Sequence, residues 1–234
     1  MTTPHRTRLI LRGHQPLAPR DPKISRIYVA SEDTHACEQY LLALQSTGIV
    51  DPARVEILPL PTLDGRSTLA AVLQRLVDER DQPGIRLASD EYWAIFDIDR
   101  QTPEYLDEQA HVASARGDHL AGSNPCFELW LLLHLTADLQ GLPRAQDDRG
   151  ACDKCDRRLH EILQGGDPRA RGYNKAKLGA ERFASEEHVD LACKRARELA
   201  PDTAPELWPT SVGTHIHRLI ERLPRPRQAQ PPHA

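Results

Sequence analysis

Residues 93–99, Trp-Ala-Ile-Phe-Asp-Ile-Asp, form an apolar run that ends in two aspartates. A short run of aromatic and β-branched residues is typical of a strand in the middle of a sheet. Because side chains alternate along a strand, Asp97 and Asp99 point to the same side if the strand extends that far. Open α/β sheets bind their ligands at the carboxyl ends of such strands. Two neighbouring carboxylates repel each other, and a divalent cation relieves that repulsion.

Three other strand-and-helix units accompany this strand. Further strands are predicted at residues 26–30, 55–60 and 119–121. Each of the four strands is followed by residues that favour the start of a helix, near Thr34, Ser67, Thr102 and Ser123. Four such units in succession predict an α/β fold, with a mostly parallel sheet flanked by helices, over residues 26–137.

The pattern changes after residue 137. Residues 138–223 are predicted to form a helical region that packs on the sheet, with helices at 151–164, 174–184 and 185–200 and a last helix around Leu219. Residues 1–25 combine basic side chains with four prolines, which predicts a flexible basic arm able to touch phosphates. The proline-rich residues 224–234 predict a disordered tail.

The composition is that of a soluble intracellular protein. The 234 residues are 39% hydrophobic and 27% charged, and the longest apolar run, near residues 129–135, is too short to cross a bilayer. Five cysteines, an odd number, favour a reducing compartment, so we expect a cytoplasmic protein with no membrane contact. The net charge of -4 does not indicate a nucleic-acid binder, although a local basic patch can still bind one.

Glu32 follows the first predicted strand, so it shares the carboxyl edge of a parallel sheet with Asp97 and Asp99. Alone, two aspartates at a strand end are more often an acidic turn than a metal site, and a third acid on the same edge reverses that preference. Carboxylate oxygens suit Mg²⁺ or Mn²⁺, which stabilises charge on a phosphate and activates water. Glu32 is then a metal ligand or a general acid or base.

A strongly apolar helix is predicted from Ser123, Asn124 and Pro125 onward. Its N-terminus, at the end of a strand, presents free N–H groups to a phosphate beside Ser123 and Asn124. Glu128 is unexpected in the first turn of such a helix. It either complements the helix dipole, or acts as a metal ligand or a partner for a basic group. His134 is expected to be a core histidine.

A basic stretch surrounds Tyr173 and comprises Arg157, Arg158, Arg169, Arg171, Lys175 and Lys177. These residues form either a solvated helical face or a surface that holds a nucleic-acid backbone over the acidic site, with Tyr173 stacked on a base. Lys175 is the lysine that we expect to neutralise charge on a metal-bound phosphate.

Cys152 and Cys155 form a Cys-X-X-Cys motif, which is half of a zinc site. His160, His188 or Cys193 would be needed to complete it. Because a second Cys-X-X-Cys is absent from the sequence, two ordinary cysteines on a polar helix are the favoured interpretation.

Residues 123–134, SNPCFELWLLLH, resemble the signature of the RloB-like family. Other residues match further motifs of that family: Glu32 and Tyr40 its EGxxTExxY motif, Asp97 and Asp99 its DxD strand, Tyr173 and Lys175 its YxK motif, and residues 214–220 its closing threonine–histidine–leucine helix. The resemblance runs from about residue 26 to residue 223. Three positions depart from it: Asp33 replaces a glycine, and Ala36 and Cys37 replace a threonine–glutamate pair.

This resemblance implies a Toprim-like (Rossmannoid) domain, related to the catalytic domains of OLD-family nucleases, and a setting in bacterial anti-phage defence. We therefore expect a Mg²⁺- or Mn²⁺-dependent nuclease acting on DNA or RNA. Its expected catalytic residues are Glu32, Asp97, Asp99, Glu128 and Lys175. The alternative is a non-catalytic defence component that binds nucleic acid, a nucleotide or a protein partner, and the three departures favour it. A nucleotide hydrolase ranks last because the sequence has no glycine-rich phosphate loop.

Overall fold

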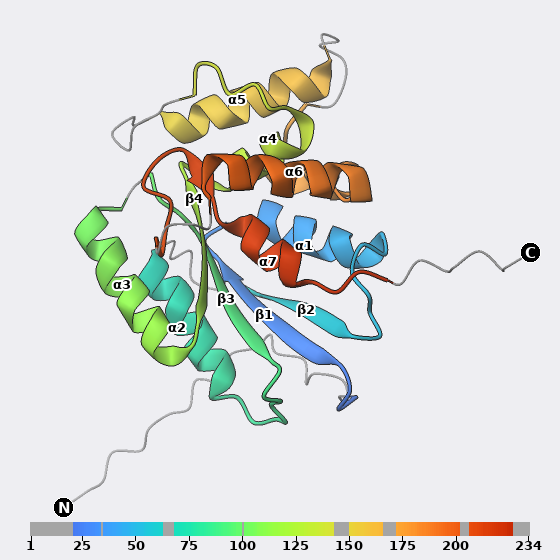
Figure 1. The fold of residues 1–234 in the computed structure, drawn as a ribbon, viewed down its shortest axis with the longest axis vertical. Helices are drawn as coiled ribbons and strands as arrows, with labels where there is room; N and C mark the ends of the chain where they lie inside the picture. The colour runs from blue at the N-terminus through green and yellow to red at the C-terminus, as the bar shows by residue number, and fades with distance from the viewer. Residues whose placement is uncertain are drawn as a thin grey trace, which may run out of the picture.

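A mostly parallel five-stranded sheet forms the centre of the protein (Figure 1). The computed structural model describes residues 21–33, 35–62, 68–99, 101–142, 150–165, 172–201 and 206–226. The strands are β1 (Ser25–Ser31), β2 (Val55–Leu60), β3 (Glu91–Asp97), β4 (His119–Asn124) and β5 (Gly213–Thr214), in the order β2-β1-β3-β4-β5. Only β5 is antiparallel to its neighbour among these strands. The predicted α/β fold with a mostly parallel sheet is therefore confirmed.

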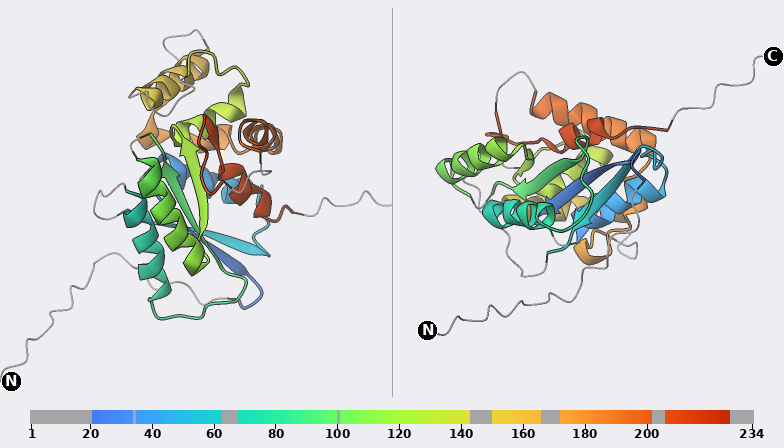
Figure 2. Two further views of the ribbon diagram at one scale, coloured as in Figure 1. Left: turned by 60° about the vertical axis from the view of Figure 1, so that its left-hand side comes forward. Right: turned by 90° about the horizontal axis from the view of Figure 1, so that it is seen from below.

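Helices cover both faces of the sheet (Figures 1 and 2). One face carries α2 (Leu69–Arg80) and α3 (Pro103–Arg116), and the other carries α1 (Ala36–Ser46), α4 (Phe127–Leu135), α6 (Glu186–Leu199) and α7 (Ile216–Arg222). Helix α5 (Ala151–Gln164) lies beyond the carboxyl ends of the strands, next to α4. The predicted helix 151–164 is thus confirmed, and the helical region shares a hydrophobic core with the sheet.

Strand β3 is buried on both faces, as its apolar run predicts. Trp93 and Ile95 face the core formed with α1 and α4, whereas Ala94 and Phe96 face α2 and α3. Parallel strands buried on both sides carry continuous apolar runs rather than alternating ones. Asp97 and Asp99 therefore lie where the chain leaves this buried strand.

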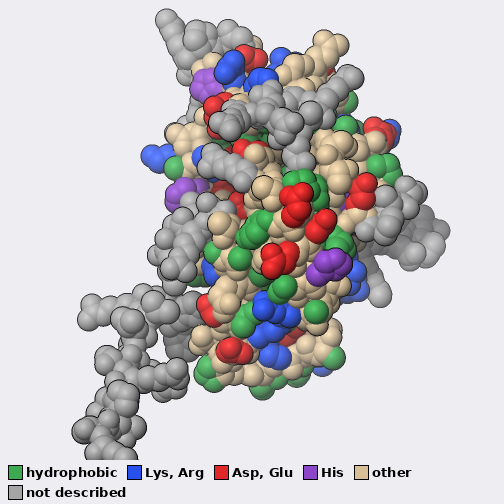
Figure 3. Space-filling view, turned by 90° about the vertical axis from the view of Figure 1, so that its left-hand side faces the viewer, with side chains coloured by type: hydrophobic (Ala, Val, Ile, Leu, Met, Phe, Trp, Pro, Cys, Tyr) green, Lys and Arg blue, Asp and Glu red, His purple; other side chains and the backbone are tan. Residues whose placement is uncertain are grey.

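The outer surface of α2 and α3 is mixed in character. Figure 3 shows hydrophobic, acidic and basic side chains interspersed over this face. Such a mixture is typical of helices that turn their polar side to water. Across the described ranges, every helix is too short or too polar to span a membrane.

Two predicted element boundaries are wrong. The fourth strand does not end at residue 121 but continues to Asn124, and α4 begins only at Phe127. The strand continues because Ser123 pairs with Asp97 on one side and with Thr214 on the other. The partner strand β5 was not predicted, since two residues carry no periodic signal.

The predicted helix at residues 174–184 is also wrong. Two single-turn 3₁₀ helices occupy this stretch, at Lys175–Lys177 and Ala180–Arg182. Gly179 lies between them with a left-handed backbone (φ 60°), which a continuous α-helix does not accommodate. The segment therefore follows the surface of α1 as an irregular strap.

Several predictions fall outside the described residues. These are the basic arm over residues 1–20, the tail over residues 227–234, the helix starts at Thr34 and Ser67, and the basic residues Arg169 and Arg171.

Candidate functional site

A cavity of about 560 Å³ opens at the carboxyl ends of β1 and β3. Its described lining combines residues from the sheet, from α3, α4 and α5 and from the irregular strap: Glu32, Asp33, Thr68, Asp97, Asp99, Gln101, Thr102, Tyr105, Glu128, Cys152, Asp153, Asp156 and Lys175. Seven of these side chains are carboxylates, and one is a lysine. All five expected catalytic residues are among them. The structure therefore brings together residues that are up to 143 positions apart in the chain.

Asp97, the last residue of β3, caps the N-terminus of α4. Its Oδ1 accepts a hydrogen bond from the backbone N–H of Phe127 at 2.9 Å. Burial raises the pKa of Asp97 well above its ordinary value, and the charges of Glu128 and Glu32 raise it further. The helix N-terminus that the sequence offers to a phosphate is thus already bound to a carboxylate of the protein.

Glu32 directly follows β1 and lies beside the end of β3. Its backbone N–H donates to the carbonyl of Ile95, at 3.0 Å. Gln101 Nε2 donates to Glu32 Oε1 and to the carbonyl oxygen of Asp97, both at 2.7 Å. Burial raises the pKa of Glu32 to about 8, and the charge of Asp99 adds to that effect. A carboxyl group with such a pKa can gain or lose a proton near neutral pH.

Asp99 lies two residues beyond the end of β3, so the alternation of side chains along a strand does not apply to it. Its Oδ2 accepts a hydrogen bond from Cys152 Sγ on α5, at 3.2 Å. A hydrogen bond with Cys126 and burial together raise the pKa of the Cys152 thiol. Helix α5 thereby forms a wall of the cavity over the acidic residues.

The predicted zinc partners of Cys152 and Cys155 do not join them. His160 Nδ1 contacts the carbonyl of Tyr173 at 3.4 Å, and His188 Nδ1 contacts that of Arg182 at 2.9 Å. In the part of the chain that the structure describes, no group of three histidine, cysteine, aspartate or glutamate side chains is arranged to hold a metal ion. A zinc site thus has no support in this geometry.

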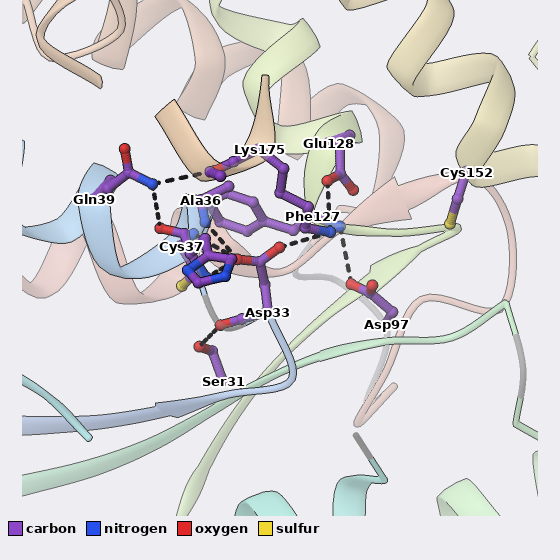
Figure 4. A network of polar contacts seen from close by, with 12 residues as sticks. Ser31, Asp33, Ala36, Cys37, Gln39, Asp97, Phe127, Glu128, Cys152 and Lys175 are labelled. Carbon is purple, nitrogen blue, oxygen red and sulfur yellow. Dashed lines mark hydrogen bonds and ion pairs between the residues drawn. The ribbon is translucent and has the colours of Figure 1, made fainter. Parts of the chain in front are cut away.

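Lys175 forms ion pairs with two acidic residues that line the cavity (Figure 4). Its Nζ lies 2.6 Å from Asp33 Oδ2 and 2.9 Å from Glu128 Oε1. Tyr173 donates its hydroxyl hydrogen to the same oxygen of Glu128, at 2.7 Å. Although burial alone would raise the pKa of Glu128, Lys175 lowers it below the ordinary value. In return, Glu128 and Asp33 outweigh burial and raise the pKa of Lys175.

Asp33 is the main residue that sequence reasoning missed. Its Oδ1 accepts hydrogen bonds from the N–H groups of His35 (2.7 Å), Ala36 and Cys37 (3.2 Å), so it satisfies the first turn of α1. Its Oδ2 holds Lys175. An aspartate just before a helix is a capping signal, and that signal can be read from the sequence. The ion pair between Asp33 and Lys175 cannot.

Gln101 and Asp156 also line the cavity without having been predicted. Gln101 is the hydrogen-bond donor that orients Glu32. Asp156, on α5, has a pKa raised to about 6 by burial and by the nearby charge of Glu128. Neither position stands out in the sequence, because each residue type is common on polar helices and turns.

The predicted phosphate-binding residues lie apart from the cavity. Ser123 and Asn124 are buried and do not belong to its described lining. Ser123 Oγ is hydrogen-bonded to Thr214 Oγ1 at 2.7 Å, and Asn124 Nδ2 donates to the carbonyl of Pro209 at 3.3 Å. Both side chains thus join β4 to the segment around β5.

The predicted basic surface is only partly present at the site. Arg157 on α5 and Lys177 on the strap are exposed. Arg158 pairs with Asp138 at 3.2 Å, so its charge is balanced. Tyr173 is held by Glu128, and Lys175 is the only lysine or arginine in the described lining of the cavity.

The donor set of the cavity suits a hard divalent cation. The seven acidic side chains offer only oxygen ligands. Burial, and to a lesser extent neighbouring carboxylates, raise the pKa of Glu32 and Asp97. Mg²⁺ is commonly held by one or two carboxylates together with water, and does not need a cage of three protein ligands.

The family profile described as RloB-like protein matches residues 27–223. No curated protein and no solved structure matches the chain. The matched range includes all five expected catalytic residues: Glu32, Asp97, Asp99, Glu128 and Lys175. The chain belongs to the RloB-like family.

Proposed function

We propose that this protein is a Mg²⁺- or Mn²⁺-dependent nuclease built on a Toprim-like domain and acting in anti-phage defence. The observation that carries the proposal is the convergence of Glu32, Asp97, Asp99, Glu128 and Lys175 on one cavity at the carboxyl edge of the sheet. This is where open α/β sheets place their active sites. Membership of the RloB-like family supports the same function.

The residues of the proposed site have different chemical roles. Asp97 and Asp99 are the carboxylates that would hold the cation, with Glu32 beside them. A divalent cation supplies, when bound, positive charge next to the phosphate that is cleaved. Glu32, with a pKa of about 8, accepts or returns a proton during hydrolysis. Lys175 provides a positive charge that can face a phosphate oxygen.

The charge of the cavity constrains how a nucleic acid is held. The cavity has seven carboxyl groups and one lysine, so acidic charge outweighs the lysine even when Glu32 and Asp97 are protonated. A polyanion is repelled by this charge, so its backbone needs added cations to rest inside the cavity. The exposed Arg157 and Lys177, outside the described lining, are suited to bind flanking phosphates. A single scissile phosphate then enters the acidic cavity together with the metal.

A cleavage assay with one matched control tests this function. DNA and RNA are incubated with wild type, Asp97→Asn and Asp78→Asn, each with Mg²⁺, with Mn²⁺ and with EDTA. Asp78 is an exposed aspartate of α2. We expect metal-dependent cleavage by wild type and Asp78→Asn, and a loss of about 100-fold or more in Asp97→Asn. Equal cleavage by all three proteins would refute the proposal.

A second candidate function is metal-independent binding without catalysis. It is favoured by the ion pairs of Lys175, which already neutralise part of the acidic cluster without any metal. Retained binding of nucleic acid in EDTA, with no cleavage under any metal condition, would select this function.

A further inference from the structure

We propose that Asp33 and Glu128 form a second cation site, next to that of Asp97 and Asp99, which the ammonium group of Lys175 fills and from which a divalent cation displaces it. The proposal deepens the function above and rests on it for the identity of the cation. It assigns a role to Asp33, and it makes Lys175 a tethered cation that regulates access of the metal.

The two carboxylates are fixed before any cation arrives. The side chains of Asp33 and Glu128 are each 2% exposed. Asp33 is anchored through Oδ1 by the first turn of α1, which leaves Oδ2 directed at Lys175. Glu128 is anchored by the hydroxyl of Tyr173 and by its place on the buried helix α4. The fold itself, and not Lys175, therefore fixes the positions of the Asp33 and Glu128 carboxylates.

The lysine, in contrast, can leave without disturbing the fold. Its side chain is 43% exposed. Its backbone is held separately, because Gln39 on α1 donates to the carbonyl of Lys175 at 3.1 Å and accepts from the N–H of Leu178 at 3.0 Å (Figure 4). Rotation of the side chain alone therefore moves the ammonium group from the carboxylates toward the cavity.

The charge balance favours exchange for a divalent cation. Two carboxylates and one ammonium leave a net charge of about -1 at this site. A divalent cation neutralises the pair completely, and two carboxylates with water suffice to hold Mg²⁺. The released ammonium group then lies beside the cavity, where a phosphate would enter.

Binding of Mn²⁺ measures this competition without nucleic acid. Free Mn²⁺ is followed by electron paramagnetic resonance during titration of wild type, Lys175→Met and the matched control Lys194→Met, at an exposed lysine of α6. We expect Lys175→Met to bind Mn²⁺ about tenfold more tightly, because the competing ammonium group is removed, and Lys194→Met to bind it as wild type does. The gain should vanish in the double variant Lys175→Met/Glu128→Gln. Equal or weaker binding by Lys175→Met, or a gain that survives Glu128→Gln, overturns the proposal.

A labelling experiment on the wild-type protein tests the displacement itself, and does not depend on whether the variants fold. Lysine acetylation by an activated ester is followed by mass spectrometry with and without saturating Mg²⁺. We expect Mg²⁺ to speed the labelling of Lys175 several-fold and to leave that of Lys194 on α6 unchanged, since Lys175 is the one that is released from the ion pairs with Asp33 and Glu128. An unchanged or slower rate at Lys175 overturns the proposal. Neither readout requires cleavage, so loss of the nuclease assignment and loss of this site are separate results.

Discussion

Glu32 and Asp97 are neighbouring carboxyl groups that both resist ionisation. Burial is the largest cause at each, and nearby carboxylates add to it: Asp99 at Glu32, and Glu128 at Asp97. Gln101 acts in the opposite direction on Glu32, because an amide N–H donated to a carboxylate stabilises its charged form. The pKa of about 8 is the balance of these effects. A residue that only orients Glu32 thus helps to set its protonation.

Substitution of Gln101 should therefore change the titration of Glu32. In metal-free protein, we expect Gln101→Leu to raise the pKa of Glu32 by at least about 1, since a hydrogen bond to a charged group is worth about 1.5–3 kcal/mol. The ¹³C chemical shift of the Glu32 carboxyl group measures this value. Gln74→Leu is the matched control, because Gln74 is exposed on α2 and should leave Glu32 unaffected. A midpoint at the ordinary glutamate value of 4.5 in wild type would contradict the prediction.

The start of α1 connects a helix cap to the site. Asp33 caps the helix through one oxygen and pairs with Lys175 through the other. The RloB-like motif has glycine at this position, and glycine can perform neither role. The departure from the motif therefore adds two kinds of contact at this position, the helix cap and the ion pair.

Two substitutions separate the roles of Asp33. We expect Asp33→Gly to lower the free energy of unfolding by about 2 kcal/mol, because the first turn of α1 loses its acceptor and Lys175 loses the charge of Asp33. Asp33→Asn keeps a side-chain oxygen for the cap and loses only the charge facing Lys175, so its loss should be smaller, about 1 kcal/mol. Urea-induced unfolding of the metal-free proteins measures both. Equal losses in the two variants would show that the cap contributes nothing.

Elements with a strong local signal were predictable from the sequence, and those defined by distant partners were not. The helix α3 (Pro103–Arg116) has Thr102 as its N-cap, as predicted, because this cap is local. The start of α4 was misplaced because Ser123 is drawn into a strand by Thr214, 91 residues away. The strap after Tyr173 was taken for a helix because its packing against α1 leaves no trace in its own sequence.

At the scale of the whole molecule, the site follows from the sheet. Parallel strands place their carboxyl ends on one edge, so it could be predicted from the sequence that Glu32, Asp97 and Asp99 share that edge. Their convergence could not, because it depends on β1 and β3 being neighbours in the sheet. The position of α5 over this edge could not, since the bond between Cys152 and Asp99 depends on how the helical region folds back. For the same reason the ion pairs of Lys175 were visible only in three dimensions.

Two titratable groups, the partly buried Glu32 and the buried His134, give the stability of the fold an unusual dependence on pH. The folded protein holds a proton on Glu32 between 4.5, its ordinary pKa, and about 8, so stability due to Glu32 is full below 4.5 and is lost as pH rises to about 8. His134 is buried against Tyr40 and Trp130, and burial lowers its pKa to about 3 from 6.5. Its contribution is full above 6.5 and is lost as pH falls.

The two slopes have opposite signs and similar size, about 1.4 kcal/mol per pH unit each. We therefore expect the contributions of these two groups to cancel between pH 4.5 and 6.5 in wild type, and that of Glu32 to lower stability as pH rises from 6.5 to 8. In Glu32→Gln this contribution is absent, so the stability of the variant relative to wild type should rise with pH between 4.5 and 8. Urea-induced unfolding of both proteins in EDTA, at half-unit steps from pH 5 to 8, measures the two profiles. Parallel profiles would show that Glu32 does not carry a raised pKa in the folded protein, and would remove it as the proton carrier of the site.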